Sequence, residues 1–205
     1  LKYMNWEDEC YLLSKKKFRE NANIINVFSQ TKGKVSGVVY GGNSRKIRNY
    51  LQLSNKLFIV HTSKNENKFG YFKTELVKPI SPLYFNDKTR TSALISLCSI
   101  LNTLLPESQP NKKIYHSFEE FLNLFNLDDW IYFFIFFELN LIKDLGFDPN
   151  LNKFKEQTND LTKFRKIKID TFTYEVPEFL ILNKLPSNFS NTLIKKSLYF
   201  TRNII

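Results

Sequence analysis

The stretch IINVFSQTKGKVSGVVY, residues 24–40, decides the fold, because two short apolar runs flank a turn at Gly33. The runs Ile24–Phe28 and Val35–Tyr40 are rich in the β-branched and aromatic residues that strands favour. Three more such runs lie outward from it, at Cys10–Leu13, Leu57–Thr62 and Phe69–Val77. Clusters of glycine and asparagine at residues 41–43 and 65–67 supply the conformations that turns need. Five short strands in about 80 residues predict a small closed barrel, and we favour the OB-fold over the similar SH3-like barrel.

The pattern changes after Pro79 and Pro82, since proline cannot donate to a sheet ladder and turns its predecessor away from helix. Apolar residues then recur at helical spacing in three segments, at 91–105, 114–125 and 130–145. The last of these is apolar around most of its circumference, which is typical of a buried central helix. Residues 167–174 are predicted to form a strand or hairpin, and 177–185 and 193–200 two further helices. The fold class is therefore α+β, an OB-fold barrel at 1–80 followed by a mainly α-helical domain at 81–205.

Composition and charge point to a globular protein with an anionic partner. The chain has 205 residues, 42% hydrophobic and 24% charged, which excludes a wholly disordered protein. Its 30 Lys+Arg against 20 Asp+Glu give a net charge of +10, and residues 1–80 alone carry 15 against 6. Such a field suits nucleic acid or an acidic membrane surface.

Several features predict a protein that stays in the cytoplasm, and a nucleic-acid partner would place it at the nucleoid. Acidic residues stand at 7–9, where a secretory signal would be apolar, and Cys10 and Cys98 cannot build a disulfide framework. The longest apolar run, Trp130–Phe137, is far shorter than the roughly 20 residues of a membrane span, so we expect no membrane partner. The start at Leu1 suggests an unusual start codon or a fragment, and the apolar ending at residues 203–205 suggests that some C-terminal sequence is missing.

The candidate nucleic-acid interface is a basic segment between residues 15 and 56 in which Glu20 is the single acid. Phe18, Phe28, Tyr40 and Tyr50 are interleaved with the cations, and flat rings can stack on unpaired bases while cations hold phosphates. The part after Gly41 and Gly42 is expected to be a mobile positive loop. The candidate DNA-binding residues are Lys15, Lys16, Lys17, Arg19, Lys32, Lys34, Arg45, Lys46, Arg48 and Lys56.

The sequence offers little evidence for a catalytic site. The acidic trio at residues 7–9 could serve a metal-dependent nuclease, but clustered acids are usually solvated. His61 and His116 are isolated, and the chain has neither a Cys-x-x-Cys pair nor a Gly-rich phosphate loop. We therefore expect no enzyme activity, no cofactor and no bound metal.

A resemblance to a known family rests on several segments taken in order. WEDECYLLS at 6–14, VFSQTKGK at 27–34 and GGNSRK at 41–46 resemble the amino-terminal region of the bacterial RecO family. LLPE at 104–107 and FELNLIKDLGF at 137–147 are similar to the helical core of that family. The order and spacing of the segments, rather than any one of them, make the match specific.

The resemblance implies a DNA repair and homologous recombination mediator of the RecF pathway. Such a protein binds single- and double-stranded DNA, anneals complementary strands and helps to load RecA together with RecR. It also implies binding of the acidic C-terminal tail of single-stranded DNA-binding protein.

Two departures from the family concern the helical domain. Many relatives carry a zinc-binding cysteine cluster, whereas residues 148–176 contain no cysteine, so we expect no zinc. Relatives often have an arginine where this chain has Phe136, so the best remaining cations for the acidic tail are Lys112, Lys113 and Lys143.

Two alternatives to a DNA-annealing mediator stay open. An RNA-binding or ribosome-associated barrel would also fit the basic N-terminal region, and preference between DNA and RNA would separate the two. A metal-dependent nuclease using the acidic trio would reveal itself by divalent-cation-dependent cleavage.

Overall fold

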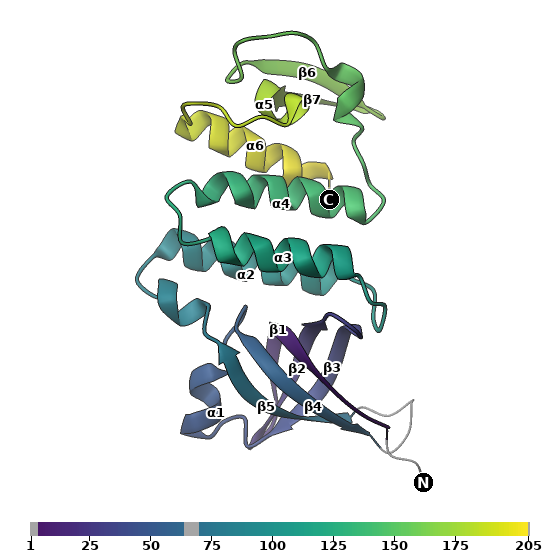
Figure 1. The fold of residues 1–205 in the computed structure, drawn as a ribbon, viewed down its shortest axis with the longest axis vertical. Coiled ribbons are helices and arrows are strands. Elements are labelled where there is room, and N and C mark those ends of the chain that lie inside the picture. Colours follow the sequence, from purple (N-terminus) through teal and green to yellow (C-terminus); the bar gives the residue numbers. More distant parts are fainter. Residues whose placement is uncertain (1–3, 64–69, 205) are drawn as a thin grey trace. The chain divides into compact units, whose positions relative to one another are not determined.

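A computed structural model describes residues 4–63 and 70–204, so the predicted turn at 65–67 and the start of the predicted strand at Phe69 lie outside the described residues. The chain divides into two compact units, Leu1–Tyr115 and His116–Ile205, called here the first and the second unit. Figure 1 shows the helices and strands of both units. The predicted division at residue 80 stays a prediction, since the first unit includes a helix beyond it.

The first unit is built on a closed five-stranded barrel with the strand order β1-β2-β3-β5-β4 (Figure 1). Strand β1 pairs with both β2 and β4, and a short parallel pairing of β3 with β5 closes the barrel. This is the OB-fold, as predicted. The strands are β1 (Met4–Arg19), β2 (Ala22–Ser29), β3 (Gly33–Tyr40), β4 (Lys56–Ser63) and β5 (Gly70–Lys78).

Strand β1 is much longer than the predicted run Cys10–Leu13. The sequence pattern missed the rest of the strand because its outward-facing residues are polar. Its pairing with β2 shifts register between Leu12 and Ser14 and again between Lys17 and Arg19. Such bulges bend a strand and increase its twist, which lets one strand serve two sides of a barrel. The barrel interior is filled by alternate apolar residues, among them Cys10, Leu12, Ile25, Val27, Leu57 and Ile59.

A tight turn at Gly33 joins β2 to β3. Gly33 has a φ of 73°, and a Cβ there would lie 2.1 Å from the backbone oxygen of Gln109. The segment at 107–108 lies beside this turn as well, because the Ser108 amide donates to the Lys34 carbonyl. A side chain at position 33 would therefore separate the turn from the segment that precedes the third helix.

Helix α1 (Arg45–Tyr50) occupies the segment that the sequence predicted to be a mobile loop, and that prediction is wrong. The Ser44 side chain accepts a hydrogen bond from the Ile47 amide and so caps the helix. Ile47 and Tyr50 pack against the barrel core. A six-residue helix is unstable alone, so tertiary packing, which local sequence does not reveal, holds it.

Helix α2 (Lys88–Leu104) packs on the barrel after the short η1 turn (Ser81–Tyr84). Asp87 caps it by accepting from the Arg90 amide. Its buried residues recur at helical spacing, and Cys98 lies against the Leu12 carbonyl of β1. The helix therefore fixes the outer side of β1 and belongs with the barrel in one compact unit.

The second unit is mainly helical, as predicted, with one hairpin. Its core joins residues of α4, α5, α6 and the β6–β7 hairpin, including Ile135, Leu139, Ile167, Phe179 and Phe200. Among the described residues, no helix is both long and apolar enough to cross a membrane. The elements are α3 (Lys112–Leu124), which begins in the first unit, α4 (Trp130–Asp144), η2 (Leu151–Phe154), β6 (Phe164–Ile169), β7 (Phe172–Pro177), α5 (Glu178–Leu182) and α6 (Asn191–Ile204).

Candidate nucleic-acid interface

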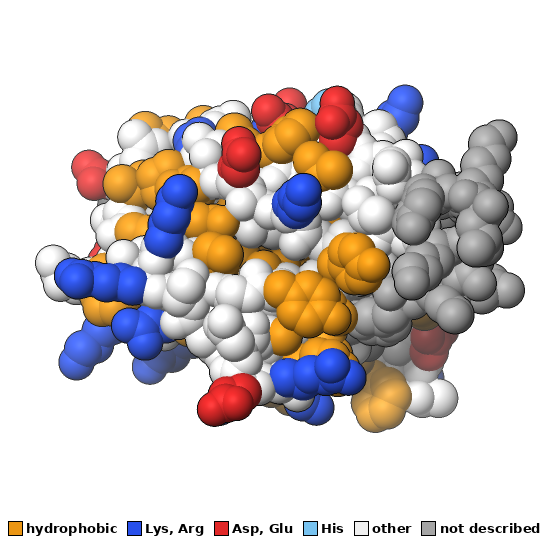
Figure 2. All heavy atoms as spheres, turned by 90° about the horizontal axis from the view of Figure 1, so that it is seen from below, with side chains coloured by type: hydrophobic (Ala, Val, Ile, Leu, Met, Phe, Trp, Pro, Cys, Tyr) orange, Lys and Arg blue, Asp and Glu red, His pale blue; other side chains and the backbone are white. Residues whose placement is uncertain are grey.

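The β1–β2 hairpin and α1 bring seven of the ten predicted cations to one end of the barrel. The loop before α1 is tied to the hairpin, because the Gly41 amide donates to the Asn21 carbonyl and the Asn43 side chain donates to the Glu20 carbonyl. Figure 2 shows Lys and Arg side chains gathered toward the side where α1 lies in Figure 1. The seven are Lys15, Lys16, Lys17, Arg19, Arg45, Lys46 and Arg48, all exposed.

Five of these cations form what we call the basic end: Lys15 and Lys17 of β1 with Arg45, Lys46 and Arg48 of α1. Lys15 and Lys17 pair with Ile25 and Asn23, which face the barrel interior and the loop before α1. Lys15 reaches the end of α1 through its hydrogen bond to the Leu51 carbonyl, and Lys17, two residues further along β1, lies on the same face of the strand.

A crowding of positive charge marks the basic end. The Lys15 ammonium donates to the Leu51 carbonyl at the end of α1, at 2.8 Å. Partial burial and the nearby Arg48 guanidinium lower the pKa of Lys15. Among the residues that the structure describes, none of the seven cations forms an ion pair with an acid. The basic end therefore has positive charge that the described part of the protein leaves uncompensated.

Lys16 points to the other side of the sheet and begins a row across four strands, which we call the aromatic face. Lys16 pairs with Ile24, Ile24 with Val38, and Val38 with Tyr71. Tyr40 lies beside Tyr71, with their ring centroids 5.9 Å apart, and the two rings are 57% and 41% exposed. Exposed rings on β3 and β5 next to a lysine can stack bases while the cation holds a phosphate.

Phe18 and Arg19 at the turn of the β1–β2 hairpin join the basic end to the aromatic face. The Arg19 guanidinium lies 5.1 Å from the centroid of the Phe18 ring, and Phe18 is 45% exposed. A cation over an exposed ring is a surface that binds both a phosphate and a base.

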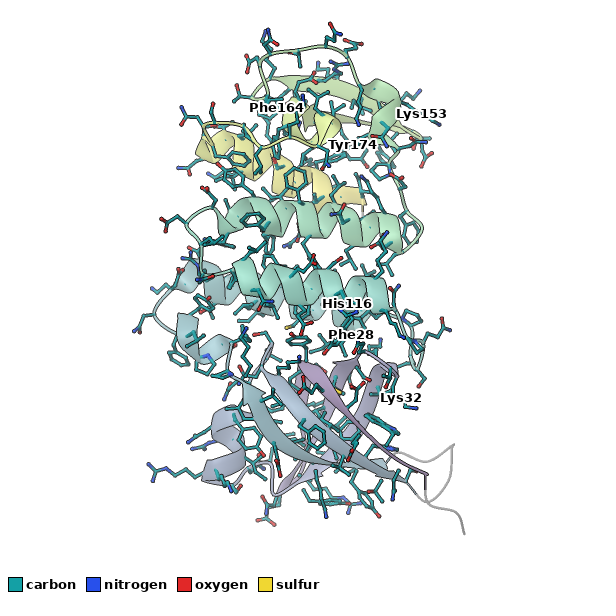
Figure 3. The ribbon with its side chains drawn as sticks, viewed as in Figure 1. Phe28, Lys32, His116, Lys153, Phe164 and Tyr174 are labelled. Atoms are coloured by element: carbon teal, nitrogen blue, oxygen red, sulfur yellow. The ribbon has the colours of Figure 1, made fainter. Side chains whose placement is uncertain are left out.

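The other three predicted cations lie elsewhere. Lys34 is nearly buried, and its ammonium donates to the Asn102 carbonyl in the last turn of α2 and pairs with Glu107. Lys56 pairs with Glu9 at 2.7 Å and lies over the Tyr11 ring. Lys32 is exposed in the β2–β3 turn, on the side of the barrel away from α1 (Figure 3). The structure therefore does not bring these three together with the basic end.

The four aromatic candidates divide in the same way. Phe18 and Tyr40 are exposed, whereas Phe28 is fully buried against Tyr115 and the Tyr50 hydroxyl donates to the Thr74 carbonyl. Tyr71 is not among the aromatic residues predicted from the sequence. Its alternation with the buried Phe72 in β5 was the available signal, because neighbouring strand residues face opposite sides.

Two residues of the acidic trio, Asp8 and Glu9, make structural contacts. Asp8 accepts hydrogen bonds from the Ser29 hydroxyl and from the amide and hydroxyl of Thr31, so it holds the β2–β3 turn. Although burial acts in the opposite direction, these bonds leave the pKa of Asp8 below its ordinary value. Glu9 pairs with Lys56. Within residues 4–63 and 70–204, no three His, Cys, Asp or Glu side chains form a group that could hold a metal ion.

The remaining reactive side chains are packed in the first unit. His61 stacks on Trp6 with the ring centroids 5.0 Å apart, and Cys10 and Cys98 are both buried. Burial raises the pKa of the Cys98 thiol to about 12. These side chains therefore belong to the packing of the first unit.

The predicted partner cations belong to two helices. Lys112 and Lys113 stand exposed in the first turn of α3, in the first unit, and Lys143 is half-buried in the last turn of α4, in the second. Phe136, at the position where relatives often have arginine, lies with its ring edge against Phe179, 5.8 Å between centroids. Phe136 therefore supports the core of the second unit.

Comparisons with known proteins agree with this geometry. The model of the N-terminal part of recombination protein O matches residues 4–80, and that of its C-terminal part matches residues 86–169. The chain is 30% identical over 152 residues to the DNA repair protein RecO of Wolbachia sp. subsp. Drosophila simulans, and 29% identical over 150 residues to that of Ruegeria sp.. The alignments cover 73% of this chain and 62% of each relative.

Proposed function

Because the chain belongs to the RecO family, we propose that it acts in DNA repair and recombination as a DNA-binding protein without enzymatic activity. The observation that carries this proposal is the union of the basic end with the aromatic face on one OB-fold barrel. OB-folds bind single strands through a positively charged groove and rings that stack bases. The chain spans 62% of the length of the relatives, so the activity of a whole relative is part of the proposal.

The expected binding is electrostatic and independent of base sequence. The seven cations lie on a strand and on one turn of helix, and neither presents a long helix that could enter a major groove. If about four to six phosphates are neutralised, the logarithm of the binding constant should fall with the logarithm of salt concentration with a slope of about −3 to −5. Both single- and double-stranded DNA offer these phosphates.

Annealing and partner binding are the finer parts of the proposal. A surface that holds two single strands by phosphates and stacked bases leaves base edges accessible, which supports annealing of complementary strands. We include RecR and the tail of single-stranded DNA-binding protein as partners, with Lys112, Lys113 and Lys143 as cations for the tail carboxylates, and RecA loading as the outcome. The exposure of Lys112 and Lys113 in the first turn of α3 supports tail binding there.

The direct test replaces the cations of α1 in the full chain, as Arg45→Ala with Lys46→Ala and Arg48→Ala. Affinity for a labelled single strand should fall for every base sequence, and the salt slope should flatten by about 2 to 3, close to 0.7–0.9 per lost phosphate contact. Fluorescence anisotropy at several salt concentrations measures both quantities. Unfolding in urea should change by less than about 0.5 kcal/mol, because the three side chains are exposed.

A matched control replaces three exposed lysines of the second unit, Lys168, Lys184 and Lys195, which lowers the net charge equally. Unchanged affinity in the α1 variant, or an equal loss in the control, would contradict an interface at the basic end. The same assay with RNA of matched sequence separates a DNA mediator from an RNA-binding barrel. Strand cleavage that requires Mg²⁺ would instead favour the nuclease alternative.

A further inference from the structure

A groove runs along the first unit between the barrel and α2. It consists of two hollows of about 390 and 370 Å³. Gln52, Leu53 and Ile95 line both hollows, so they are continuous. One hollow reaches β1 at Leu13, Ser14 and Lys15 and α2 at Ser99 and Asn102, and the other is lined also by Asn49, Ser81, Pro82, Phe85 and Thr91.

The groove opens directly onto the basic end. Lys15 lines the groove and also belongs to the basic end. Asn49, which lines the groove too, directly follows Arg48 in α1. The Gln52 side chain donates to the Arg48 carbonyl at 2.9 Å, which ties the groove wall to α1. In Figure 1, α1 and the segment that leads from β5 to α2 lie on the same side of the barrel. The groove and the basic end therefore form one continuous surface of the first unit.

The lining combines three kinds of chemistry. Among the described lining residues none is acidic, and Lys15 is the one that carries a charge. More than half of the lining side chains are amides or hydroxyls, which both donate and accept hydrogen bonds. Leu53, Pro82, Phe85 and Ile95 supply apolar surface.

Phe85 is the most exposed ring among the described residues of the first unit. Its side chain is 83% exposed, directly after the η1 turn, and Ile95 on α2 is 51% exposed across the same hollow. Water-exposed apolar side chains at the mouth of a polar groove mark a binding surface. A flat ring there offers a stacking partner.

We propose that this groove holds a nucleotide of a single strand that continues from the basic end, with its base stacked on Phe85 and its phosphate near Lys15. The proposal rests on the proposed function. A nucleotide presents a flat base, polar base edges and an anion together, which are the three chemistries of the lining. Duplex DNA keeps its bases stacked inside, so it has no base to place against Phe85.

An acidic peptide with an apolar residue is the main competitor for the same groove. Its carboxylates would seek several cations, whereas Lys15 is the only cation among the described lining residues. The many amide and hydroxyl groups have more partners on base edges than on aliphatic or carboxylate side chains. The lining therefore favours a nucleotide.

The test compares Phe85→Ala with the control Leu83→Ala in the full chain. Leu83 is 66% exposed in η1 but lines neither hollow, so both variants remove an exposed apolar side chain. With a labelled oligothymidine of about 20 nucleotides, Phe85→Ala should lower affinity about five- to tenfold, the loss expected for one stacked base. Leu83→Ala should leave the affinity for oligothymidine unchanged. Neither variant should change the affinity for a duplex of equal length.

Crosslinking supplies an independent readout. Oligonucleotides with bromodeoxyuridine should crosslink under ultraviolet light to a peptide containing Phe85, and the crosslink should disappear in Phe85→Ala. Equal loss of single-strand and duplex affinity, no loss, or competition by an acidic peptide but not by oligothymidine would overturn the proposal. If the α1 triple variant weakens binding while Phe85→Ala does not, the groove fails and the proposed function stands. If neither variant weakens binding, the proposed function fails as well.

Discussion

The arginines of the second unit and the exposed cations at the barrel end of the first unit are used in opposite ways. In the second unit each described arginine contacts a carboxylate: Arg165 donates to Glu178 at 2.7 Å and Arg202 donates to Glu138 at 2.7 Å. Both of these glutamates are buried. At the barrel end of the first unit, the seven exposed cations have no acid partner within the described residues. The two arginines of the second unit thus hold the fold, while the cations of the basic end remain available to an anion from outside.

The strongest test of this comparison removes Arg202. Glu138 on α4 is fully buried and accepts from the Thr201 hydroxyl and the Arg202 guanidinium of α6. Removing one partner of a buried pair typically costs about 3–5 kcal/mol, and because Arg202 is 40% exposed we expect about 2–3 kcal/mol for Arg202→Ala. DNA affinity should stay unchanged.

Tryptophan fluorescence can follow this unit separately. The chain has two tryptophans, Trp6 in the barrel and Trp130 in α4, so a Trp6→Phe background reports urea unfolding of the second unit. The matched control is Lys195→Ala, an exposed cation of the same helix, which should change the free energy of unfolding by less than about 0.5 kcal/mol. Equal effects of the two substitutions would mean that the Glu138 pair does not hold the fold.

A second, smaller effect separates two lysines of the first unit that look alike in sequence. The Lys34 ammonium occupies the carboxyl end of α2, where it donates to the Asn102 carbonyl at 2.8 Å and favours the helix dipole. Lys34→Ala should lower the stability of the barrel by about 1.5–2 kcal/mol, the lower part of the range for a hydrogen bond that involves a charged group. Lys16→Ala should leave stability unchanged and lower DNA affinity, because Lys16 is exposed on the aromatic face.

Urea unfolding followed by Trp6 in a Trp130→Phe background measures the first effect, and anisotropy with a single strand measures the second. A loss of DNA affinity in Lys34→Ala with unchanged stability would return Lys34 to the interface. A loss of stability in Lys16→Ala would show that the two lysines are not used differently.

The difference between these lysines marks how far sequence could predict the interface. Periodicity and turn residues predicted the barrel, the helices and the hairpin, because these patterns are local. Lys34 is held by Asn102, and Phe28 is buried against Tyr115. Both partners lie far along the chain and come close only in the folded protein, so local sequence could not predict these contacts. Helix α1 was missed because its stability comes from packing of Ile47 on the barrel. The charge count predicted the basic region. The distinction between its exposed cations and the ion-paired Lys34 and Lys56 required the structure.

The smallest predicted effect is a difference in pH dependence between the units, and it sharpens the comparison because the two signs are opposite. Burial raises the pKa of Glu138 above its ordinary 4.5, although Thr201 and Arg202 act in the other direction. The folded state therefore binds this proton more tightly than the unfolded state, and the stability of the second unit should fall as pH rises from 4.5 through the raised pKa. In the first unit the lowered pKa of Asp8 has the opposite consequence, since its contribution is lost as pH falls below 3.8.

Glu138→Gln isolates the first of these contributions, because an amide of the same shape cannot titrate. We expect the free energy of unfolding of the wild type, relative to Glu138→Gln, to decrease between about pH 4.5 and neutral pH, as measured by Trp130 fluorescence in urea. Asp8→Asn is the counterpart in the barrel, where the difference should instead grow as pH rises from below 3.8. If the wild type gained stability over Glu138→Gln with rising pH, the ion pair with Arg202 would outweigh the burial of the carboxylate, and the second unit would use its charges as a source of net stability rather than as a compensated cost.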